Sequence, residues 1–311
     1  MGKRGVGLLI LLLSFIAVPA FTQDPYLLNI LITTGIWTTS VWGVRVIMST
    51  GQLTLGHAAY MAVGAYASTL LTMKIGLSFW LAFPLAGLIS SLVALLIGYP
   101  TLRIKGVYFA IITFAFAEIV RLLIVHWPSL LGGYGGIPNV PPPSPIFNIS
   151  FKSRIPFYYL ILVLCLVTYV VMVRIDRSRI GKIFASIHES DTLAESIGIN
   201  IMKYKITAFC IGCFFAGMSG SFYAHYFNFT SPEFFTIWQS VYCLVFVIVG
   251  GAGSVWGPLL GSFFMTLVPE LLRVARELEP VIYAVILIAV MFVLPGGLVT
   301  LPARLRWKKA H

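Results

Sequence analysis

Long apolar runs, separated by short polar segments, occupy almost the whole chain. The runs are continuous, as in Phe157 to Val173, and lack the period-two alternation of a half-buried strand, so they predict helices. A membrane-spanning helix needs about 20 apolar residues, and eight to ten runs approach that length. The expected spans cover residues 5–21, 26–48, 53–73, 79–98, 107–126, 156–173, 204–225, 237–250, 257–272 and 281–295. We therefore predict an all-α, polytopic membrane helix bundle of about eight to ten transmembrane helices, forming a single domain over residues 1–311.

The composition supports a membrane protein and argues against a soluble fold. Hydrophobic residues make up 59% of the chain and charged residues 10%, with a mean hydropathy of +0.95. Soluble domains carry about 25% charged residues. A single core could not enclose this much apolar surface, whereas a bilayer can accept it when backbone groups are bonded within helices.

The net charge of +11 is best explained by membrane topology. A basic chain first suggests nucleic acid, but here the positions of the charges matter more. With the N-terminus in the cytoplasm, fifteen Lys and Arg residues fall in inside segments and five in outside segments, which is a positive-inside bias. We therefore expect both termini in the cytoplasm and no nucleic-acid partner.

The first 23 residues allow two interpretations. Lys3 and Arg4 precede an apolar run, and a polar segment follows it, as in a cleaved signal peptide. We prefer a retained first span. Cleavage would move only the N-terminus to the outside and leave the remaining topology unchanged.

Residues 174–203 form the longest polar stretch that is rich in charge. Its first part predicts a short amphipathic helix that Ser178 can cap. The apolar positions of this helix recur at helical spacing and are Ile180, Ile183, Phe184 and Ile187.

A second short helix is predicted to begin near Ser190, Asp191 and Thr192, whose side-chain oxygens can cap it. Glu195 lies three residues after Thr192, as in a capping box, and Gly198 suits the left-handed residue that ends a helix. Two such helices form either a rigid knob between spans or a surface helix lying flat on the bilayer. The residues alone favour neither.

Glycines and polar residues at the head of the third apolar run predict a broken or re-entrant helix, whose free amide groups can face a carboxylate or polar substrate. These candidate residues are Gly51, Gln52, Thr54, Gly56 and His57. The segment from Gly250 to Ser254 has similar character.

Small residues recur at four-residue spacing, as in Gly212, Ala216 and Gly220. Such stripes let helix backbones approach closely. Close helix contacts within the chain are the favoured interpretation, and a pathway or subunit contact is the alternative.

Glu118 and Arg121 are charged residues inside the fifth predicted span, three positions apart on one helical face. A charge in lipid is costly, so the pair must face protein or water. A structural ion pair is one interpretation, and contact with a zwitterionic substrate or a neighbouring subunit is the other. We group the pair with residues 51–57 as candidates for a translocation pathway or subunit contact.

Catalytic and metal-binding patterns are missing from the sequence. It contains no phosphate-binding loop, no H-E-x-x-H and no G-x-S-x-G, and its five histidines are scattered. The four cysteines all lie in apolar runs, where they fill space. We expect no catalytic residue, metal or cofactor in this chain, and ATP could drive it only through another subunit.

Several segments together resemble a known family. They include TGQLTLGHAA at 50–59, RIKGVYFA at 103–110, AEIVR at 117–121 and GGAGSVWGP at 250–258. Over residues from about 40 to 300, the chain resembles the permease subunits of bacterial ABC importers for branched-chain amino acids, specifically the M-type member of the paired permeases.

The resemblance implies a multi-pass protein of the bacterial cytoplasmic (inner) membrane that works with several partners. They are a second homologous permease, two cytoplasmic ATPases that hold ATP and Mg²⁺, and a periplasmic or extracellular binding protein. It also implies that residues 174–203 form the loop that couples to the ATPase. The coupling candidates are Ser190, Asp191, Thr192, Ala194, Glu195 and Gly198. The general permease pattern of Glu-Ala-Ala, three residues, then Gly is poorly kept, since Thr192-Leu193-Ala194 occupies the triplet.

Two other transport functions remain open. Permeases for urea and short amides look similar, and the binding protein sets the cargo. An ion-coupled secondary transporter would need more ionisable groups in the spans than Glu118 and Arg121.

Overall fold

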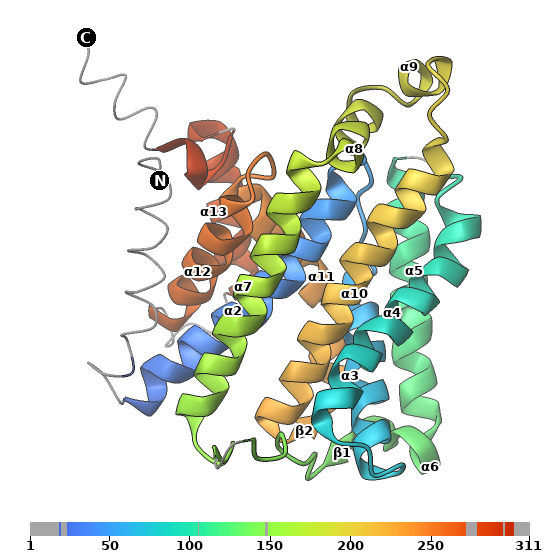
Figure 1. The fold of residues 1–311 in the computed structure, drawn as a ribbon. Helices are drawn as coiled ribbons and strands as arrows, with labels where there is room; N and C mark the ends of the chain where they lie inside the picture. The colour runs from blue at the N-terminus through green and yellow to red at the C-terminus, as the bar shows by residue number, and fades with distance from the viewer. Residues whose placement is uncertain are drawn as a thin grey trace.

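The structure is a computed structural model that describes Pro19 and residues 24–104, 106–146, 149–271, 279–294 and 296–301. Figure 1 shows a bundle of long helices with short elements at its two ends. The long helices are α2 (Pro25–Met48), α3 (His57–Met73), α4 (Phe79–Thr101), α5 (Val107–His126), α7 (Arg154–Arg177), α10 (Ile201–Phe227), α11 (Ile237–Gly250), α12 (Trp256–Leu271) and α13 (Glu279–Val293). The short elements are α6 (Pro128–Leu131), η1 (Gly133–Gly135), β1 (Ile137–Pro138), α8 (Arg179–Glu189), α9 (Asp191–Ser196), β2 (Phe229–Thr230), η2 (Pro232–Phe235) and η4 (Leu298–Thr300).

The all-α prediction is confirmed. Each predicted span from residue 26 onward coincides with a helix, and the span expected over 5–21 lies, apart from Pro19, outside the described residues. Among the described helices, α2, α4, α5, α7 and α10 are long and apolar enough to cross a membrane. Helix α3 has 17 residues and α11 only 14.

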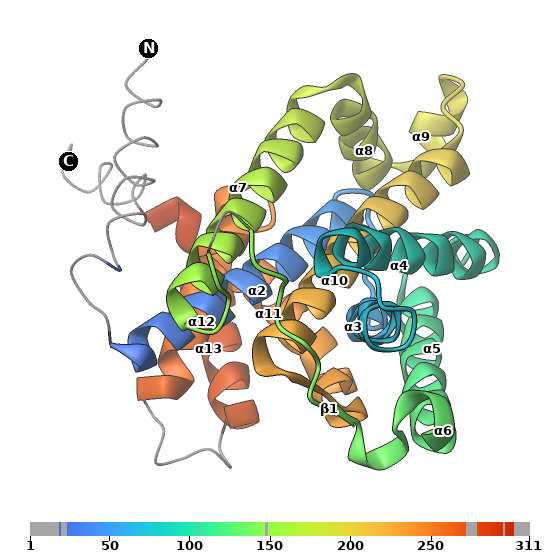
Figure 2. The same cartoon turned by 60° about the horizontal axis from the view of Figure 1, so that its bottom comes forward.

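Helices α2 and α10 form the centre of the bundle. Helix α10 contacts α2, α3 and α4, and α2 also contacts α7, α11 and α12. In Figures 1 and 2, α4 and α5 lie at one edge of the bundle and α12 and α13 at the opposite edge. Most of α2 is therefore buried, whereas α4, α5 and α7 leave wide faces uncovered.

Small residues allow the central helices to touch. The glycine stripe of α10 places Gly212 against the carbonyl of Gly43 on α2, and Gly217 against Gly64 on α3. A Cβ atom at Gly220 would overlap the carbonyl oxygen of Met61. The favoured interpretation of this stripe, close helix contacts within the chain, is confirmed.

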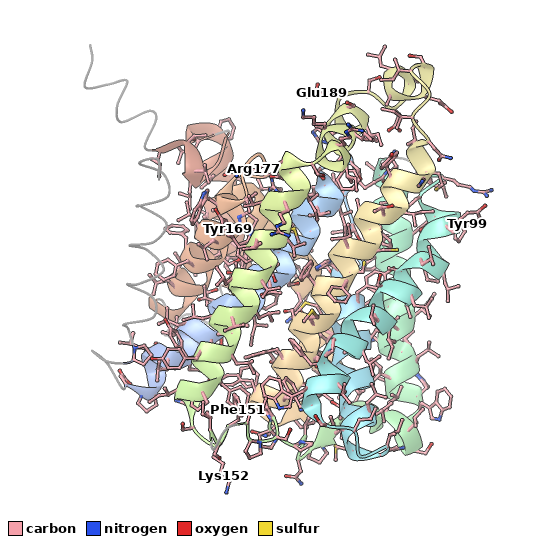
Figure 3. The ribbon with its side chains drawn as sticks, in the orientation of Figure 1. Tyr99, Phe151, Lys152, Tyr169, Arg177 and Glu189 are labelled. Carbon is pink, nitrogen blue, oxygen red and sulfur yellow. The ribbon has the colours of Figure 1, made fainter. Side chains whose placement is uncertain are left out.

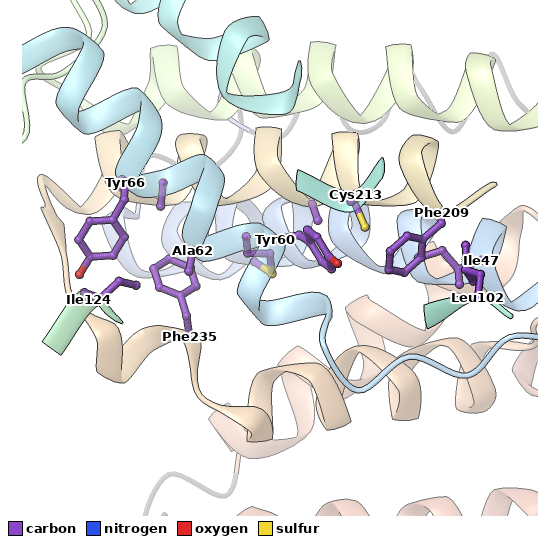
Figure 4. Close-up of a cluster of buried hydrophobic side chains, with 14 of the residues drawn as sticks. Ile47, Tyr60, Ala62, Tyr66, Leu102, Ile124, Phe209, Cys213 and Phe235 are labelled. Atoms are coloured by element: carbon purple, nitrogen blue, oxygen red, sulfur yellow. The ribbon is translucent and has the colours of Figure 1, made fainter. Parts of the chain in front are cut away.

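A cluster of buried side chains lies where α3 and α10 meet. It includes Tyr60, Phe209 and Cys213 and extends to Tyr66 and Phe235 (Figure 4). The Tyr60 and Phe209 rings meet edge to face, with centroids 5.4 Å apart. Such aromatic pairs stabilise a core beyond the area they bury.

The two ends of the bundle differ. Helices α8 and α9 project from one end, and β1, β2 and α6 close the other (Figure 1). Figure 3 shows Arg177 and Glu189 near the α8–α9 end and Lys152 at the β1–β2 end.

A two-stranded ladder fastens the β1–β2 end. Strands β1 and β2 pair antiparallel, with Ile137 opposite Thr230. Asn228 donates from Nδ2 to the carbonyl of Val140 at 2.9 Å, and His225 Nδ1 lies 2.6 Å from the carbonyl oxygen of Pro141. The long loop after α5 is thereby tied to the end of α10.

Candidate functional site

Helix α8 begins and ends as its sequence predicts. The Ser178 hydroxyl accepts from the Gly181 N–H at 3.3 Å and caps the helix. Two of the four stripe residues, Phe184 and Ile187, are buried against the bundle, whereas Ile180 is 40% exposed. The buried part of this face packs on the bundle, as the rigid-knob interpretation expects, and that interpretation stays a prediction.

Helix α9 corrects one detail of the sequence analysis. Its cap is Ser190, whose hydroxyl accepts from the Leu193 N–H at 3.3 Å. Thr192 therefore lies inside the first turn, and the capping box expected between Thr192 and Glu195 is wrong. Gly198 takes a φ of +84°, so the predicted left-handed stop is confirmed.

An ion pair fastens α9 to the bundle. Lys205 on α10 donates from Nζ to Asp191 Oδ2 at 2.8 Å, and both side chains are largely buried. Ala194 is also buried. Asp191 and Ala194 thus hold the element in place, while Glu195 and Gly198 line an open groove beside α9 together with Arg103.

The outer side of α9 carries two apolar residues that were not among the predicted coupling residues. Leu193 is 69% exposed and Ile197 is 74% exposed. Residues four apart lie on one face of a helix or its continuation, so the two form an apolar tip. The signal that could have identified them is the four-residue spacing of two large apolar side chains on a short polar helix.

A second ion pair joins three segments near the base of α8. Arg45 on α2 donates to both carboxylate oxygens of Asp176 on α7, at 3.2 and 2.7 Å. Its Nε also donates to the carbonyl of Ala252, between α11 and α12, at 3.0 Å. The forked guanidinium suits a carboxylate of this geometry, and it links the helix that leads into α8 to the α11–α12 turn.

Helix α3 begins deep inside the bundle, as expected of a broken helix. His57, its first residue, places Nε2 3.0 Å from the carbonyl oxygen of Ser40. Ser40 lies eight residues before the end of α2, which is about 12 Å along a helix. Residues 51–56 are not helical and connect that end of the bundle to its interior.

Helix α11 also begins inside the bundle, beside α3. The Ala58 N–H donates to the Ser240 hydroxyl at 2.8 Å, and the Leu55 N–H donates to Thr113 on α5 at 3.0 Å. The first turns of α3 and α11 are therefore neighbours, so two positive helix ends meet in the bundle interior.

We call the buried polar residues on the segment that leads into α3, and those hydrogen-bonded to its first turn, the polar centre. It comprises Ser40, Gln52, Thr54, His57 and Ser240, which are all buried. Among the described residues, Gln52 Oε1 and His57 Nδ1 have no hydrogen-bond partner. The chain itself encloses the polar centre, and a pathway role for its residues stays a prediction.

The two glycine candidates differ in their surroundings. Gly51 is exposed and lies against His188 of α8, with a φ of +75°. Gly56 directly precedes α3, donates its N–H to the Thr54 hydroxyl at 3.1 Å and is buried against the Thr113 carbonyl of α5. Of the residues grouped from the sequence, Gly51 therefore lies apart from the start of α3, and Gly56 belongs to it.

Glu118 and Arg121 form the ion pair that their spacing predicts. Arg121 Nε lies 3.0 Å from both carboxylate oxygens, and Nη2 lies 2.5 Å from Oε1. The Glu118 side chain is 41% exposed and that of Arg121 is 28% exposed. Thr113, which is buried, lies about 140° away from Glu118 around the helix. The pair therefore faces away from the polar centre.

Comparison with known proteins identifies the family. A family model described as "Branched-chain amino acid transport system / permease component" matches residues 26–294. The match includes every described helix that crosses the bundle except the first residue of α2. The chain belongs to this permease family. Its many apolar helices and its permease relatives make it a multi-pass membrane protein.

Individual permease relatives come from bacteria and an archaeon. The chain is 32% identical over 280 residues to the "High-affinity branched-chain amino acid transport system permease protein LivM" of Salmonella typhimurium and of Escherichia coli. Each alignment covers 82% of this chain and 66% of the relative. The chain thus spans slightly less than two thirds of the length of these relatives.

A more distant relative is the "Probable branched-chain amino acid transport permease protein LivM" of Methanocaldococcus jannaschii, which is 23% identical over 234 residues, covering 70% of this chain and 67% of the relative. No solved structure matches the chain.

Proposed function

We propose that this chain is a transmembrane permease subunit of an ATP-driven importer for branched-chain amino acids. The observation that carries the proposal is the family match over residues 26–294. The chain performs no chemistry itself. It works with a second homologous permease, two cytoplasmic ATPase subunits that bind ATP and Mg²⁺, and a substrate-binding protein outside the membrane.

The α8–α9 end faces the cytoplasm in this proposal. The described basic residues support that orientation, because Arg45, Arg103, Arg177 and Lys203 belong to segments at the α8–α9 end, whereas the opposite end has fewer. Short loops on the cytoplasmic side of membrane proteins carry an excess of Lys and Arg. The membrane is then the bacterial cytoplasmic (inner) membrane.

Residues 174–203 are the element that couples ATP hydrolysis to transport. The element has the rigidity that such a role requires, because Phe184 and Ile187 of α8 are buried and the Asp191–Lys205 ion pair fixes α9 to α10. Arg45 extends this connection to the α11–α12 turn. A movement of the ATPase against α9 would therefore reach α2, α7, α10 and α11 together.

Substrate crosses the membrane by alternating access between this chain and its partner permease. ATP binding moves the ATPases, the coupling element transmits the movement, and the bundle changes the side to which the pathway opens. The ATPases must bind the inward-open and outward-open conformations with different affinities, because a partner that binds both equally cannot shift the equilibrium between them.

The function is tested by purifying the chain from its native membrane in mild detergent and reconstituting what accompanies it. We expect a second permease and an ATPase, and uptake of radiolabelled leucine, isoleucine or valine that requires ATP and the binding protein. Purification of the chain alone, or only with itself, would contradict the importer. ATP-driven uptake of urea or a short amide instead would correct the cargo.

Replacing Leu193 and Ile197 together with glutamate should uncouple the importer. The two apolar side chains are exposed at the tip of α9, and we propose that they enter an apolar groove of the ATPase. Two carboxylates would have to be desolvated there, so ATPase co-purification and uptake should both fall at least tenfold, an effect of about 1.4 kcal/mol or more.

The matched control for this pair is Ser186→Glu, an exposed position on α8. It should retain coupling, and all variants should reach the membrane in equal amounts. Unchanged ATPase binding and uptake in the Leu193/Ile197 variant would remove α9 as the docking element.

A further inference from the structure

A groove lies between α4 and α7, with α10 as its floor. We call it the α10 groove, and its volume is about 570 Å³. Figure 1 shows α10 between α7 and α4 on this side of the bundle. The wall of the groove comprises Ser91 and Leu95 of α4, Val171 and Ile175 of α7, and six residues of α10 between positions 206 and 215.

The wall of the α10 groove is suited to hydrocarbon. Most of its side chains are aliphatic or aromatic. Its polar groups are already bonded within the chain, since the Thr207 hydroxyl donates to the Lys203 carbonyl at 2.8 Å and the Ser91 and Cys210 side chains pair with each other. Because no donor or acceptor of the wall is left for water, an apolar ligand fits the groove better than a polar one.

The dimensions of the groove exclude a helix. Residues 206 to 215 extend about 14 Å along α10, which is close to half of the roughly 30 Å of hydrocarbon in a bilayer. The volume of about 570 Å³, divided by this length, gives a mean cross-section of about 40 Å². A helix about 10 Å across would need about 80 Å². Carbon atoms pack about 4 Å apart, so two hydrocarbon chains of roughly 20 Å² each fit side by side.

Two basic side chains lie at the end of the groove nearest α8 and α9. Lys203 is the third residue of α10 and precedes Ile206 by three positions, so it continues the floor of the groove. Arg174, near the end of α7, follows Val171 of the wall by three positions. Both side chains are exposed, and neither forms an ion pair or donates a hydrogen bond within the described part of the chain.

Arg103 provides a third basic group at this end, from α4. Its guanidinium carbon lies 5.1 Å from the centroid of the Tyr99 ring, and Tyr99 follows Leu95 of the wall by four positions. Figure 3 shows Tyr99 at the α8–α9 end of the bundle. The three helices that form the groove therefore each carry a basic residue at the same end of it.

The carboxylates of this end do not neutralise the three basic residues. Asp176 and Asp191 are ion-paired with buried basic residues of α2 and α10. Glu189 and Glu195 are exposed, and two further exposed basic residues of α8 match them in number. The mouth of the groove is therefore positively charged, and an anionic group is complementary to it.

We propose that the α10 groove binds an anionic phospholipid. Its two acyl chains lie against α10, and its phosphate lies among Lys203, Arg174 and Arg103. A phospholipid joins an apolar part of this width to a negative headgroup, which is the combination that the groove and its mouth require. The inference takes from the proposed function only the orientation, which places this end in the cytoplasmic leaflet, where anionic lipids attract basic segments.

The test is photolabelling of the purified importer in lipid nanodiscs. The reagent is phosphatidylglycerol that carries a diazirine in one acyl chain, and mass spectrometry locates the labelled residues. We expect labels on residues 206–215 of α10 and on Leu95 and Val171, which line the groove. An excess of unlabelled phosphatidylglycerol should suppress this labelling, whereas the same excess of zwitterionic phosphatidylcholine should not.

A tryptophan at Leu95 should fill the groove and lower its labelling several-fold. Leu95 belongs to the wall and is 42% exposed. The matched control is Leu96→Trp, because Leu96 is the next residue of α4, is 65% exposed and lies about 100° away around the helix, outside the wall. Leu96→Trp should be labelled in the groove like the unaltered chain.

Replacing Lys203 with glutamine should weaken the competition by phosphatidylglycerol about fivefold, because one basic residue near an anionic lipid surface contributes about 1 kcal/mol. The charge-matched control is Arg177→Gln. Arg177 acts electrostatically on Tyr169, whose ring lies 5.0 Å from that of Trp256 on α12, so this variant removes the same charge from the other side of α7. It should leave the competition unchanged.

Three results would overturn the inference. Labels spread equally over the exposed faces of α4 and α7, and insensitive to Leu95→Trp, would show bulk lipid only. Phosphatidylcholine that competes as well as phosphatidylglycerol would remove the anionic headgroup. A groove without label would show that another protein chain covers it. Each result would leave the proposed function intact, since none of them measures transport or identifies the subunits.

Discussion

Replacing Gly220 with leucine is expected to leave almost no folded protein in the membrane. The α10 backbone touches α3 at this residue, and a Cβ atom would overlap the carbonyl oxygen of Met61. The obstacle is backbone, so a side-chain rotation cannot relieve it. Overpacking a core costs about 1–3 kcal/mol and occasionally more, and the separation of two central helices belongs at or above the upper end of that range.

The measurement is thermal stability in detergent, together with the yield of monodisperse protein. Gly253→Ala is the matched control, because a Cβ atom there meets no heavy atom within 4 Å. It should behave like the unaltered chain. A Gly220→Leu protein with ordinary yield and melting temperature would show that α3 and α10 do not approach as closely as described.

Replacing Arg45 with methionine is expected to destabilise the base of the coupling element. Arg45 is buried and bonds both Asp176 and the Ala252 carbonyl. Removing one partner of a fully buried ion pair costs about 3–5 kcal/mol. Asp176 is 35% exposed, so water screens part of the effect and we expect roughly 2–4 kcal/mol.

Two further variants separate charge from geometry at this position. Arg45→Lys keeps the charge but loses the forked contact, so it should recover only part of the stability. Adding Asp176→Leu to Arg45→Met should also restore part of it, because no carboxylate is then left without its partner. A melting temperature of Arg45→Met equal to that of the unaltered chain would show that the ion pair carries no stability.

Local patterns in the sequence predicted most of the fold. The apolar runs predicted the positions of the helices, because a helix that spans the membrane needs a continuous apolar stretch independently of its tertiary contacts. The Glu118–Arg121 pair and the cap at Ser178 were also predictable, since each depends on residues three positions apart. The capping box predicted at Thr192 was wrong, because the Ser190 hydroxyl caps the helix two residues earlier.

The arrangement of distant segments was not predictable in this way. Arg45 meets Asp176 across 131 positions and Ala252 across 207, and from the sequence Arg45 was only one of the fifteen basic residues assigned to inside segments. Only the residues of the polar centre that lie in the 51–57 segment were predicted. The unusual residues 51–57 stood out, but nothing local indicated that the Ser40 carbonyl would lie beside His57 or the Ser240 hydroxyl beside the Ala58 N–H.

The short length of α11 has a consequence for biogenesis. Its 14 residues extend about 21 Å, which is less than the roughly 30 Å of hydrocarbon that an independent span must cross. Its first turn is stabilised by α3, whose own start depends on α2 and α5. We therefore expect α11 to enter the membrane together with the earlier helices that surround it and not as an independent span.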